Sequence, residues 1–527
     1  MATVEHRVAA LADLPENGMR GLDIAGRSII LARTGDRVTA LSAFCTHFGA
    51  PLAEGVVHDG RIVCPWHHAC FDAGDGRPLD PPALDGLKAY DCRLDGGDVY
   101  VRLPPRSRER VTPAAAPSGG DGRRMVIVGA GAAGAAAAES LRQRGFAGRI
   151  TLISAEAALP YDRTLLSKEI LQGIATPAPS DLRPASFYAA RHIELRLGRR
   201  VVAVDADARS LTLDDGSRLG YDACLLATGG RPRRLDVPGA ELDGVVTLRS
   251  PEDVDRILRA AALEMPVVVI GASFIAMECA ASLQSRGCPV TVLAPEPVPF
   301  ARLFGERVGR ALKARHERTG TRFVTGEVAR FDGQGAVEAV VTAEGGRLPA
   351  GLAIVGIGVL PATSDLRGLS LAEDGSVPVD GRLQALPDLF AAGDIARFPE
   401  PVSGATTRIE HWRLAQEHGR LAAGSMLGEQ AVYDGVPFFW STQHWGLYYA
   451  GHTQGFDDVV FDGAPEQDMF LAYYVKDGRV PAVLGVSRNT EMAALGELLR
   501  LRRMPDSDRL RQGGFDPVQA LRASGEA

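Results

Sequence analysis

The sequence predicts a multidomain protein with an N-terminal all-β domain, two α/β domains and a C-terminal α+β domain. Residues 1–104 alternate short apolar runs with Gly, Asp and Pro turns, as antiparallel strands do. From Met125 onward strands alternate with helices, which is typical of a parallel sheet. The segment RMVIVGAGAAG then recurs as PVVVIGASFIA, with first glycines at positions 129 and 271, 142 residues apart.

Changes of composition along the chain predict the boundaries. A stretch rich in Pro, Ala, Gly, Ser and Arg follows the all-β domain and predicts a linker. The last hundred residues carry strand-like runs and then the helix-like EMAALGELLRLRR. We therefore expect the following division: an all-β domain at 1–104, a linker at 105–123, a first α/β domain at 124–244 and 363–432, a second at 245–362, and an α+β domain at 433–527.

The composition is that of an ordinary globular protein. A net charge of −7 gives no indication of nucleic-acid binding. No run of eighteen apolar residues predicts a membrane span, and no basic start followed by an apolar stretch predicts a secretory signal, so we expect a cytoplasmic protein. Seven cysteines do not suit a disulfide framework. Five of them are expected to be reduced thiols with packing roles: Cys70, Cys92, Cys224, Cys279 and Cys288.

Two Cys-His pairs in the all-β domain predict an iron–sulfur site. Cys45 and His47 are followed by Cys64 and His67, and each pair fits the tip of a tight loop. Two thiolates can hold one iron of a [2Fe–2S] cluster while two imidazoles hold the other, the Rieske arrangement. The alternative is a zinc site, but the C-x2-4-C and H-x3-5-H spacings usual for zinc are missing. His68 could replace His67 as a ligand; position favours His67, and His68 is expected at the surface.

Each α/β domain carries a glycine turn between a strand and a helix. In the first, Gly129, Gly131 and Gly134 allow a tight turn and a close approach to a pyrophosphate at the helix N-terminus. Glu156, after the next strand, can bind ribose hydroxyls.

The second turn has Gly271, Ser273 and Ala276, where small residues still allow helix–strand contact. Its next strand ends at Glu296, whose carboxylate favours the free 2′-hydroxyl of NADH over the 2′-phosphate of NADPH. Arg302 lies nearby and weakens that preference.

Four further segments carry a family resemblance: LPYDRTLLSKEIL, LLATGGRP, LFAAGDIA and RIEHWRLAQEHG. With the two glycine turns, they resemble the ferredoxin-reductase-type, FAD-dependent pyridine nucleotide oxidoreductases. With the N-terminal domain included, the chain most resembles the apoptosis-inducing-factor-like subgroup, whose members fuse both modules. Two prolines of the family's P-Y-x-R-P-P-L-S-K segment are replaced by Thr164 and Leu165, which puts the shape of that loop in question.

The resemblance implies roles for individual residues. Arg163 should stabilise the FAD pyrophosphate and Asp394 should bond its ribitol. Lys168 should lie beside flavin N5 and pair with Glu278. Trp412 should lie close to the nicotinamide, and Trp440 resembles a family Trp near the flavin, although packing alone explains it nearly as well. The remaining cofactor-binding positions are Ala227, Thr228, Gly229, Gly358 and Gly393.

The cluster is expected to have a low potential. High-potential Rieske centres carry an extra disulfide and hydroxyl donors, but Ala50 and Trp66 stand at the disulfide positions, and Ala69 and Phe71 replace the donors. Fewer hydrogen bonds to the cluster sulfurs lower the potential, so we expect about −150 mV.

These features predict an NADH-dependent oxidoreductase that passes electrons from flavin through the cluster to a ferredoxin, cytochrome or oxygenase component. Two alternatives stay open: an NADH oxidase or peroxide-handling enzyme, and a redox-sensing interaction protein. A dithiol reductase is disfavoured, because no cysteine lies between Cys92 and Cys224, where a flavin-adjacent pair would stand. A homodimer is compatible with the sequence.

Overall fold

The computed structural model describes residues 4–104, 120–175 and 180–524 of the chain. Its contacts divide the chain into two compact units. Unit 1 comprises Met1–Ala114, Asp434–Trp440 and Tyr448–Ala527, and unit 2 comprises Ala115–Tyr433 and Ser441–Leu447. Most of the predicted linker, residues 105–119, lies outside the described residues, and the predicted domain boundaries stay predictions.

The N-terminal part of unit 1 consists of two antiparallel sheets. The larger sheet has the order β1-β10-β9-β4-β3-β2, formed by Val4–Ala10, Asp98–Leu103, Ala89–Asp95, Arg37–Ser42, Arg27–Thr34 and Gly18–Ile24. The smaller sheet has the order β5-β6-β7-β8, formed by Val56–His58, Arg61–Val63, Cys70–Asp72 and Pro78–Asp80. The all-β prediction for this domain is confirmed. The loop between β4 and β5 carries Cys45 and His47, and the loop between β6 and β7 carries Cys64 and His67.

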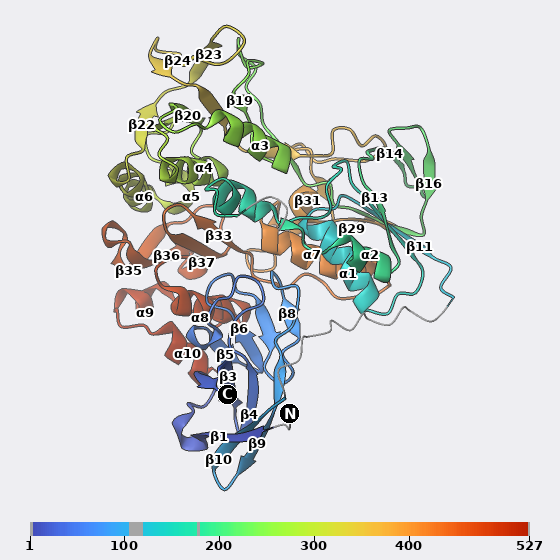
Figure 1. The fold of residues 1–527 in the computed structure, drawn as a ribbon, viewed down its shortest axis with the longest axis vertical. Helices are drawn as coiled ribbons and strands as arrows, with labels where there is room; N and C mark the ends of the chain where they lie inside the picture. Colours follow the sequence, from blue (N-terminus) through green and yellow to red (C-terminus); the bar gives the residue numbers. More distant parts are fainter. Residues whose placement is uncertain (1–3, 105–119, 176–179, 525–527) are drawn as a thin grey trace. The chain divides into compact units, whose positions relative to one another are not determined.

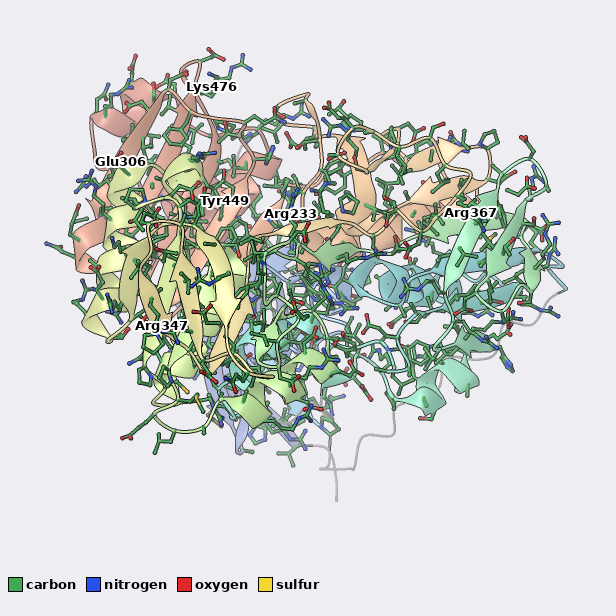
Figure 2. All side chains as sticks on the ribbon, turned by 90° about the horizontal axis from the view of Figure 1, so that it is seen from above. Arg233, Glu306, Arg347, Arg367, Tyr449 and Lys476 are labelled. Carbon is green, nitrogen blue, oxygen red and sulfur yellow. The ribbon has the colours of Figure 1, made fainter. Side chains whose placement is uncertain are left out.

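The C-terminal domain has a five-stranded sheet followed by helices, all of which belong to unit 1 except Ser441–Leu447. The sheet has the order β33-β34-β37-β36-β35, formed by Phe438–Thr442, Gly446–Gly451, Arg479–Val486, Met469–Lys476 and Asp458–Ala464. Three helices follow: α8 (Asn489–Arg500), α9 (Ser507–Arg511) and α10 (Pro517–Ala523). Tyr449 of β34 is buried in this domain, whereas Lys476 at the end of β36 is exposed; both are labelled in Figure 2. The predicted α+β class is confirmed.

The first α/β domain of unit 2 is built on a mainly parallel sheet. Its order is β13-β12-β11-β17-β30-β29, formed by Ile193–Arg196, Arg149–Ile153, Arg124–Val128, Ala223–Leu226, Leu389–Ala391 and Gln384–Leu386. The helices α1 (Ala132–Gln143) and α7 (Trp412–Met426) pack closely against each other. A Cβ at Gly419 of α7 would lie 2.1 Å from the carbonyl oxygen of Ala133, so only glycine permits this approach. Helix α2 (Ala185–Ala190) precedes β13.

The second α/β domain repeats this architecture. Its parallel sheet has the order β19-β26-β20-β21-β22, formed by Val245–Val246, Leu352–Val355, Val267–Ile270, Val290–Ala294 and Arg322–Thr325. Four helices accompany it: α3 (Pro251–Ala260), α4 (Phe274–Ser285), α5 (Ala301–Phe304) and α6 (Glu306–Arg318). Every residue of β20 is buried, which explains the unbroken apolar run VVVI. The internal repeat is thus a repeated fold.

Short strands complete unit 2. Two three-stranded sheets are β14-β15-β16 (Val201–Asp205, Ser210–Leu213, Arg218–Gly220) and β23-β24-β25 (Val328–Asp332, Ala339–Thr342, Arg347–Pro349). The pair β18-β27 and the sheet β28-β31-β32 comprise Gly230–Pro232, Val359–Pro361, Val377–Pro378, Ala396–Pro399 and Thr406–Thr407. Across the described ranges, no helix combines the length and apolar character needed to cross a membrane.

Candidate functional site

Two loops with the same hydrogen-bond pattern carry the predicted cluster ligands. In the first, the N–H of Cys45 donates to the carbonyl oxygen of Ala50 at 2.9 Å. In the second, the N–H of Cys64 donates to the carbonyl oxygen of Ala69, also at 2.9 Å. Each loop therefore closes on itself and presents its Cys and His at the tip. The two cysteines are buried and the two histidines are half-buried.

The four side chains converge on one point. The Nδ1 atoms of His47 and His67 lie 3.1 Å apart. The thiols of Cys45 and Cys64 are hydrogen-bonded, which lowers the pKa of Cys45 and raises that of Cys64. No group of three or more His, Cys, Asp and Glu side chains in the described residues is arranged to hold a single metal ion. Two thiols beside each other and two imidazole nitrogens beside each other suit two irons with two ligands each, so this donor set fits a [2Fe–2S] cluster.

Aromatic rings of the C-terminal domain lie against this loop pair within unit 1. The ring of Trp440 is 4.4 Å from that of His67 and 6.0 Å from that of His47, between centroids. His68 stacks on Phe438 at 3.8 Å and is only 4% exposed. The expectation that His68 lies at the surface is wrong, because the C-terminal domain covers it.

The first glycine turn has the geometry of a dinucleotide cradle. Gly129 has a φ of +106°, and a Cβ there would lie 2.1 Å from the carbonyl oxygen of Ala227. A Cβ at Gly134 would lie 1.8 Å from the carbonyl oxygen of Gly129. Gly131 is the N-cap of α1 and supplies no side-chain cap, so the first N–H groups of the helix face outward. This arrangement fits a pyrophosphate at the helix N-terminus.

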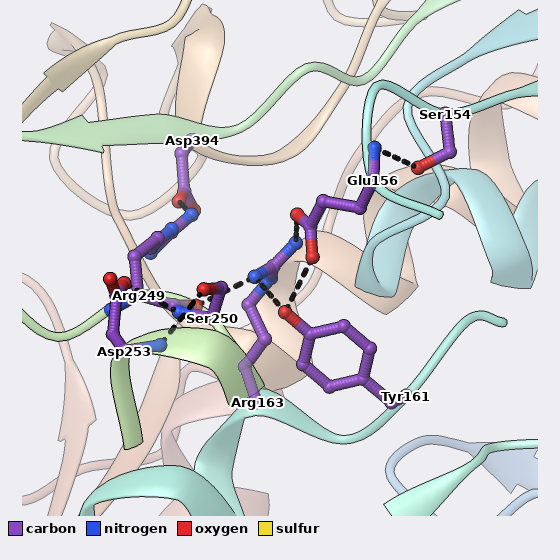
Figure 3. Close-up of polar contacts among 8 residues, drawn as sticks. All are labelled: Ser154, Glu156, Tyr161, Arg163, Arg249, Ser250, Asp253 and Asp394. Carbon is purple, nitrogen blue, oxygen red and sulfur yellow. Dashed lines mark hydrogen bonds and ion pairs between the residues drawn. The ribbon is translucent and has the colours of Figure 1, made fainter. Parts of the chain in front are cut away.

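Charged side chains predicted to bind FAD form two ion pairs near this turn. Figure 3 shows Glu156 paired with Arg163, while Tyr161 donates its hydroxyl to Glu156 at 2.7 Å. Burial raises the pKa of Tyr161, which keeps its phenol protonated. Asp394 pairs with Arg249 at 3.1 Å (Figure 3). The backbone of Arg249 in turn accepts from Arg163 at 2.8 Å, so all these groups form one connected set.

The predicted Ala227–Gly229 segment and Gly393 border the same charged set. The hydroxyl oxygen of Thr228 is buried and has no hydrogen-bond partner in the described part of the chain. Gly229 has a φ of +72°, and a Cβ there would lie 3.2 Å from the guanidinium of Arg249. Gly393 adopts a φ of +71° where a Cβ would lie 3.3 Å from Ala415 of α7. The glycine cradle, an unsatisfied buried hydroxyl and paired charges all fit a bound dinucleotide such as FAD.

Lys168 and Glu278 form a buried ion pair. Their Nζ and Oε2 atoms are 3.1 Å apart, and the side chains are 8% and 3% exposed. Lys168 lies in a π-helical turn, Leu166–Ile170, a local geometry frequent at functional sites. Its ammonium also donates to the carbonyl oxygen of Thr164 at 2.8 Å. The pair is therefore held rigidly, away from water.

Glu278 is surrounded by donors. Ser167 donates to Oε2 at 2.6 Å, and Ser441 donates to Oε1 at 2.7 Å. The N–H of Thr442 adds a longer contact to Oε1 at 3.3 Å. Gln443 donates to the Ser441 oxygen at 2.9 Å, which directs the Ser441 proton toward Glu278. A buried ion pair is tolerated only when its remaining hydrogen-bonding capacity is filled, as here.

The second glycine turn is also formed, with a serine in place of the middle glycine. Gly271 has a φ of +93°, and a Cβ there would lie 2.6 Å from the carbonyl oxygen of Gly356. Ser273 caps α4 by accepting from the N–H of Ala276, and its hydroxyl donates to Gly356 at 2.7 Å. Nearby Gly358 has a φ of +97°.

Glu296 follows β21 at the place predicted for ribose recognition. Arg302 lies 3.5 Å from it, with side-chain exposures of 90% for Arg302 and 47% for Glu296. This loose pair leaves Glu296 accessible to a ligand. Trp412 is the first residue of α7 and is half-buried against the core of the first α/β domain.

None of the seven cysteines, all of which are described, forms a disulfide. Complete burial raises the pKa of Cys224 and Cys279, so both thiols stay protonated and unreactive. Burial also raises the pKa of Cys92 to about 11. These thiols match the packing role expected for them.

Three residues of these sites were missed from the sequence, and a fourth was misplaced. Ser167, Ser441 and Arg249 had no assigned role, and Arg249 lies in no recognisable pattern. Ser441 was detectable only through its place beside Trp440 in FFWSTQH. His68 was noticed but placed wrongly, since its neighbours come from distant segments of the chain.

Family comparisons agree with this layout. A model described as a pyridine nucleotide-disulphide oxidoreductase matches residues 123–419. A Rieske [2Fe-2S] domain model matches residues 5–91, and a reductase C-terminal model matches residues 438–523.

Individual relatives cover most of the chain. It is 38% identical to Apoptosis-inducing factor 3 of Homo sapiens, over 95% of this chain and 85% of that protein. It is 33% identical to the ferredoxin--NAD(+) reductase component of the biphenyl dioxygenase system of Paraburkholderia xenovorans (strain LB400), over 76% of this chain and 98% of that protein. Among solved structures, the covalent putidaredoxin reductase–putidaredoxin complex aligns with a TM-score of 0.72 and 32% identity, over 77% of this chain and 99% of that chain.

Proposed function

This chain belongs to the pyridine nucleotide-disulphide oxidoreductase family, and from that premise we propose that it is an NADH-dependent reductase that delivers electrons through its own Rieske cluster. It is a ferredoxin-reductase-type NAD(P)H oxidoreductase with FAD and a [2Fe–2S] cluster as cofactors. The proposal adds the order of transfer: from NADH to FAD, then to the cluster, then to a one-electron acceptor. That acceptor is a ferredoxin, a cytochrome or an oxygenase component.

Strand β33 is the observation that carries the proposal. Trp440 packs against both predicted histidine ligands of the cluster. The next residue, Ser441, donates to Glu278, which pairs with Lys168 of the proposed flavin site. Two consecutive residues of one strand therefore belong to the two networks, and the chain itself joins them covalently.

The bound groups supply the redox chemistry: FAD accepts a hydride from NADH, and the cluster carries one electron at a time. The protein supplies binding, orientation and charge. We propose that Lys168 places a fixed positive charge at the reacting edge of the flavin and that Glu278 keeps it there. Arg163, Glu156 and Asp394 would hold the dinucleotide, with Arg163 and Arg249 turning from their present carboxylate partners toward the phosphates. Trp412 is proposed to border the nicotinamide.

The coenzyme is proposed to be NADH. Glu296 stands at the end of β21, where its carboxylate can accept from both ribose hydroxyls and would repel a 2′-phosphate. Its loose contact with Arg302 is half exposed to solvent, so a ligand can displace it at little cost.

The relatives support an acceptor of the ferredoxin class. The biphenyl dioxygenase relative is named a ferredoxin--NAD(+) reductase component. The alignment covers 98% of that relative and 76% of this chain. The Rieske domain, at residues 5–91, is additional to that shared part. We propose that this fused domain takes the place of a separate ferredoxin as the first acceptor.

Anaerobic mixing with NADH tests the order of transfer. Flavin bleaching is followed by absorbance, and cluster reduction is followed by electron paramagnetic resonance of samples frozen at intervals. We expect the cluster to be reduced after the flavin in the wild type and no cluster signal in Cys64→Ala, with flavin reduction retained. A fully reduced flavin beside an intact cluster that stays oxidised would contradict the proposal. Turnover with oxygen alone, equal to that with an added ferredoxin, would favour an NADH oxidase instead.

A further inference from the structure

The N-terminal and C-terminal domains of unit 1 share one apolar core. Val56 and Val63 of the N-terminal domain are buried in the same cluster as Leu495 and Leu498 of α8. Strand β5 contacts both α8 and α10, and Figure 1 shows these helices beside the short N-terminal sheet. Because separation would expose this apolar surface to water, burial favours the docked arrangement.

The imidazole ring of His68 packs between residues of the C-terminal domain. Its ring stacks on Phe438 with an interplanar angle of 20°. On another side lies Gly496 of α8, where a Cβ would approach the ring atoms Nδ1 and Cε1 of His68 to 3.0 and 3.2 Å. His68 has a φ of +54°, which a residue with a side chain rarely adopts and which the surrounding structure must enforce. The imidazole is therefore fixed by contacts that come from the other domain.

Polar contacts border this apolar region. Arg61 of β6 lies 3.4 Å from Glu497 of α8, whose side chain is only 7% exposed. Glu497 also pairs with Arg500 at 2.7 Å, so undocking would remove one of its two cations. Thr490 donates its hydroxyl to the carbonyl oxygen of Glu54 at 2.6 Å. A buried carboxylate that loses a cation is costly, which adds to the apolar preference for docking.

We propose that the Rieske domain is permanently docked on the C-terminal domain, and that His68 is the positioning residue that holds His67 against Trp440. His67 precedes His68 directly, so immobilising His68 between Phe438 and Gly496 leaves the His67 ring little freedom to leave Trp440. The role of His67 as an iron ligand rests on the proposed function, whereas the docking does not. The Rieske domain then stays on the C-terminal domain while its cluster accepts and releases electrons.

Cleavage of the backbone between the two domains tests the docking. A specific protease site is placed between residues 105 and 119 of the full holoprotein, the cut protein is diluted to about one micromolar, and the fragments are separated by gel filtration. We expect the wild-type fragments to elute together. Gly496→Leu inserts a side chain where the His68 ring lies, and we expect the dissociation constant of the fragments to rise by about a hundredfold. His68→Gly should raise it by about tenfold.

Matched controls separate docking from folding. Arg7→Ala removes an ion pair with Asp98 inside the N-terminal domain and should leave the fragments together. Absorbance of flavin and cluster before cleavage shows whether each variant is folded and loaded, and Gly496 is not a predicted ligand of either. Separation of the wild-type fragments would overturn the docking, and unchanged association in Gly496→Leu would overturn the part of His68 in it. An electron paramagnetic resonance spectrum of the reduced cluster that is the same in uncut His68→Gly as in the wild type would overturn the positioning of His67 by His68. Fragments that stay together while NADH fails to reduce the cluster would refute the proposed route alone.

Discussion

Ser441→Ala is expected to weaken the Lys168–Glu278 pair without touching either charge. In the wild type, Oε1 of Glu278 accepts from Ser441 at 2.7 Å and from the N–H of Thr442 at 3.3 Å. The substitution removes the shorter bond and also leaves the Gln443 amide without its acceptor. A hydrogen bond to a charged group contributes about 1.5–3 kcal/mol, so we expect unfolding free energy to fall by about 2 kcal/mol.

The same loss should appear in the flavin if Lys168 stabilises its reduced form. If all of it acts on that form, a two-electron midpoint potential would fall by about 40 mV. The assays are chemical unfolding of the FAD-bound protein and an anaerobic redox titration of the flavin. Ser441→Thr keeps the hydroxyl and should restore both values, while Thr442→Val keeps the backbone donor and should change neither.

Equal stabilities of Ser441→Ala and Thr442→Val would refute the expected effect, because the Ser441 hydroxyl would then contribute nothing to the buried pair. A loss of stability with an unchanged flavin potential would support the hydrogen bonds around Glu278. It would also show that Lys168 does not stabilise the reduced flavin. The two readouts therefore test the geometry and the assigned role separately.

Three further predictions follow from other sites. The cluster is expected to titrate near −150 mV, and a midpoint above about +100 mV would contradict the argument from the missing donors at Ala69 and Phe71. Glu296→Gln is expected to improve kcat/KM for NADPH relative to NADH by about tenfold; an unchanged ratio in steady-state assays would show that Glu296 does not face the ribose. His418 is buried among aromatic rings, and burial lowers its pKa to about 3. The unfolded chain therefore binds a proton below about pH 6.5 that the folded protein excludes, so stability should fall by up to about 1.4 kcal/mol per pH unit toward pH 4. In His418→Leu the unfolding free energy should depend less steeply on pH than in the wild type. Equal slopes in the two proteins would contradict the assignment of this pH dependence to His418.

Local patterns were sufficient where the chemistry is local. The turn at Gly129 requires glycine because its φ is positive and the Ala227 carbonyl is close. The sequence indicates this turn because the glycine stands between a strand-like run and a helix-like run. The Cys-His pairs are likewise set by tight loops of six residues. In these cases residues that are close in the sequence are also close in the folded protein, so the sequence pattern predicts the local geometry.

Contacts between distant segments could not be predicted from local sequence patterns. Lys168 and Glu278 lie on separate domains and were paired only through the family resemblance. Ser441 reaches Glu278 from 163 positions along the chain, and no periodicity in FFWSTQH indicates that partner. His68 shows the limit most clearly: beside a cluster ligand in a loop it looked exposed, yet the C-terminal domain buries it.

The sequence by itself determined the domain classes and the two dinucleotide turns. It also provided the prediction of the four cluster ligands. Those features depend on short segments whose backbone and donor groups are adjacent in the chain. Only the tertiary structure decided what surrounds them: the donors around Glu278, the Arg249–Asp394 pair, and the packing of His67 and His68 against Trp440 and Phe438 of the C-terminal domain. Packing brings together residues that share no local pattern, and their environment is settled by burial and hydrogen bonding across the fold.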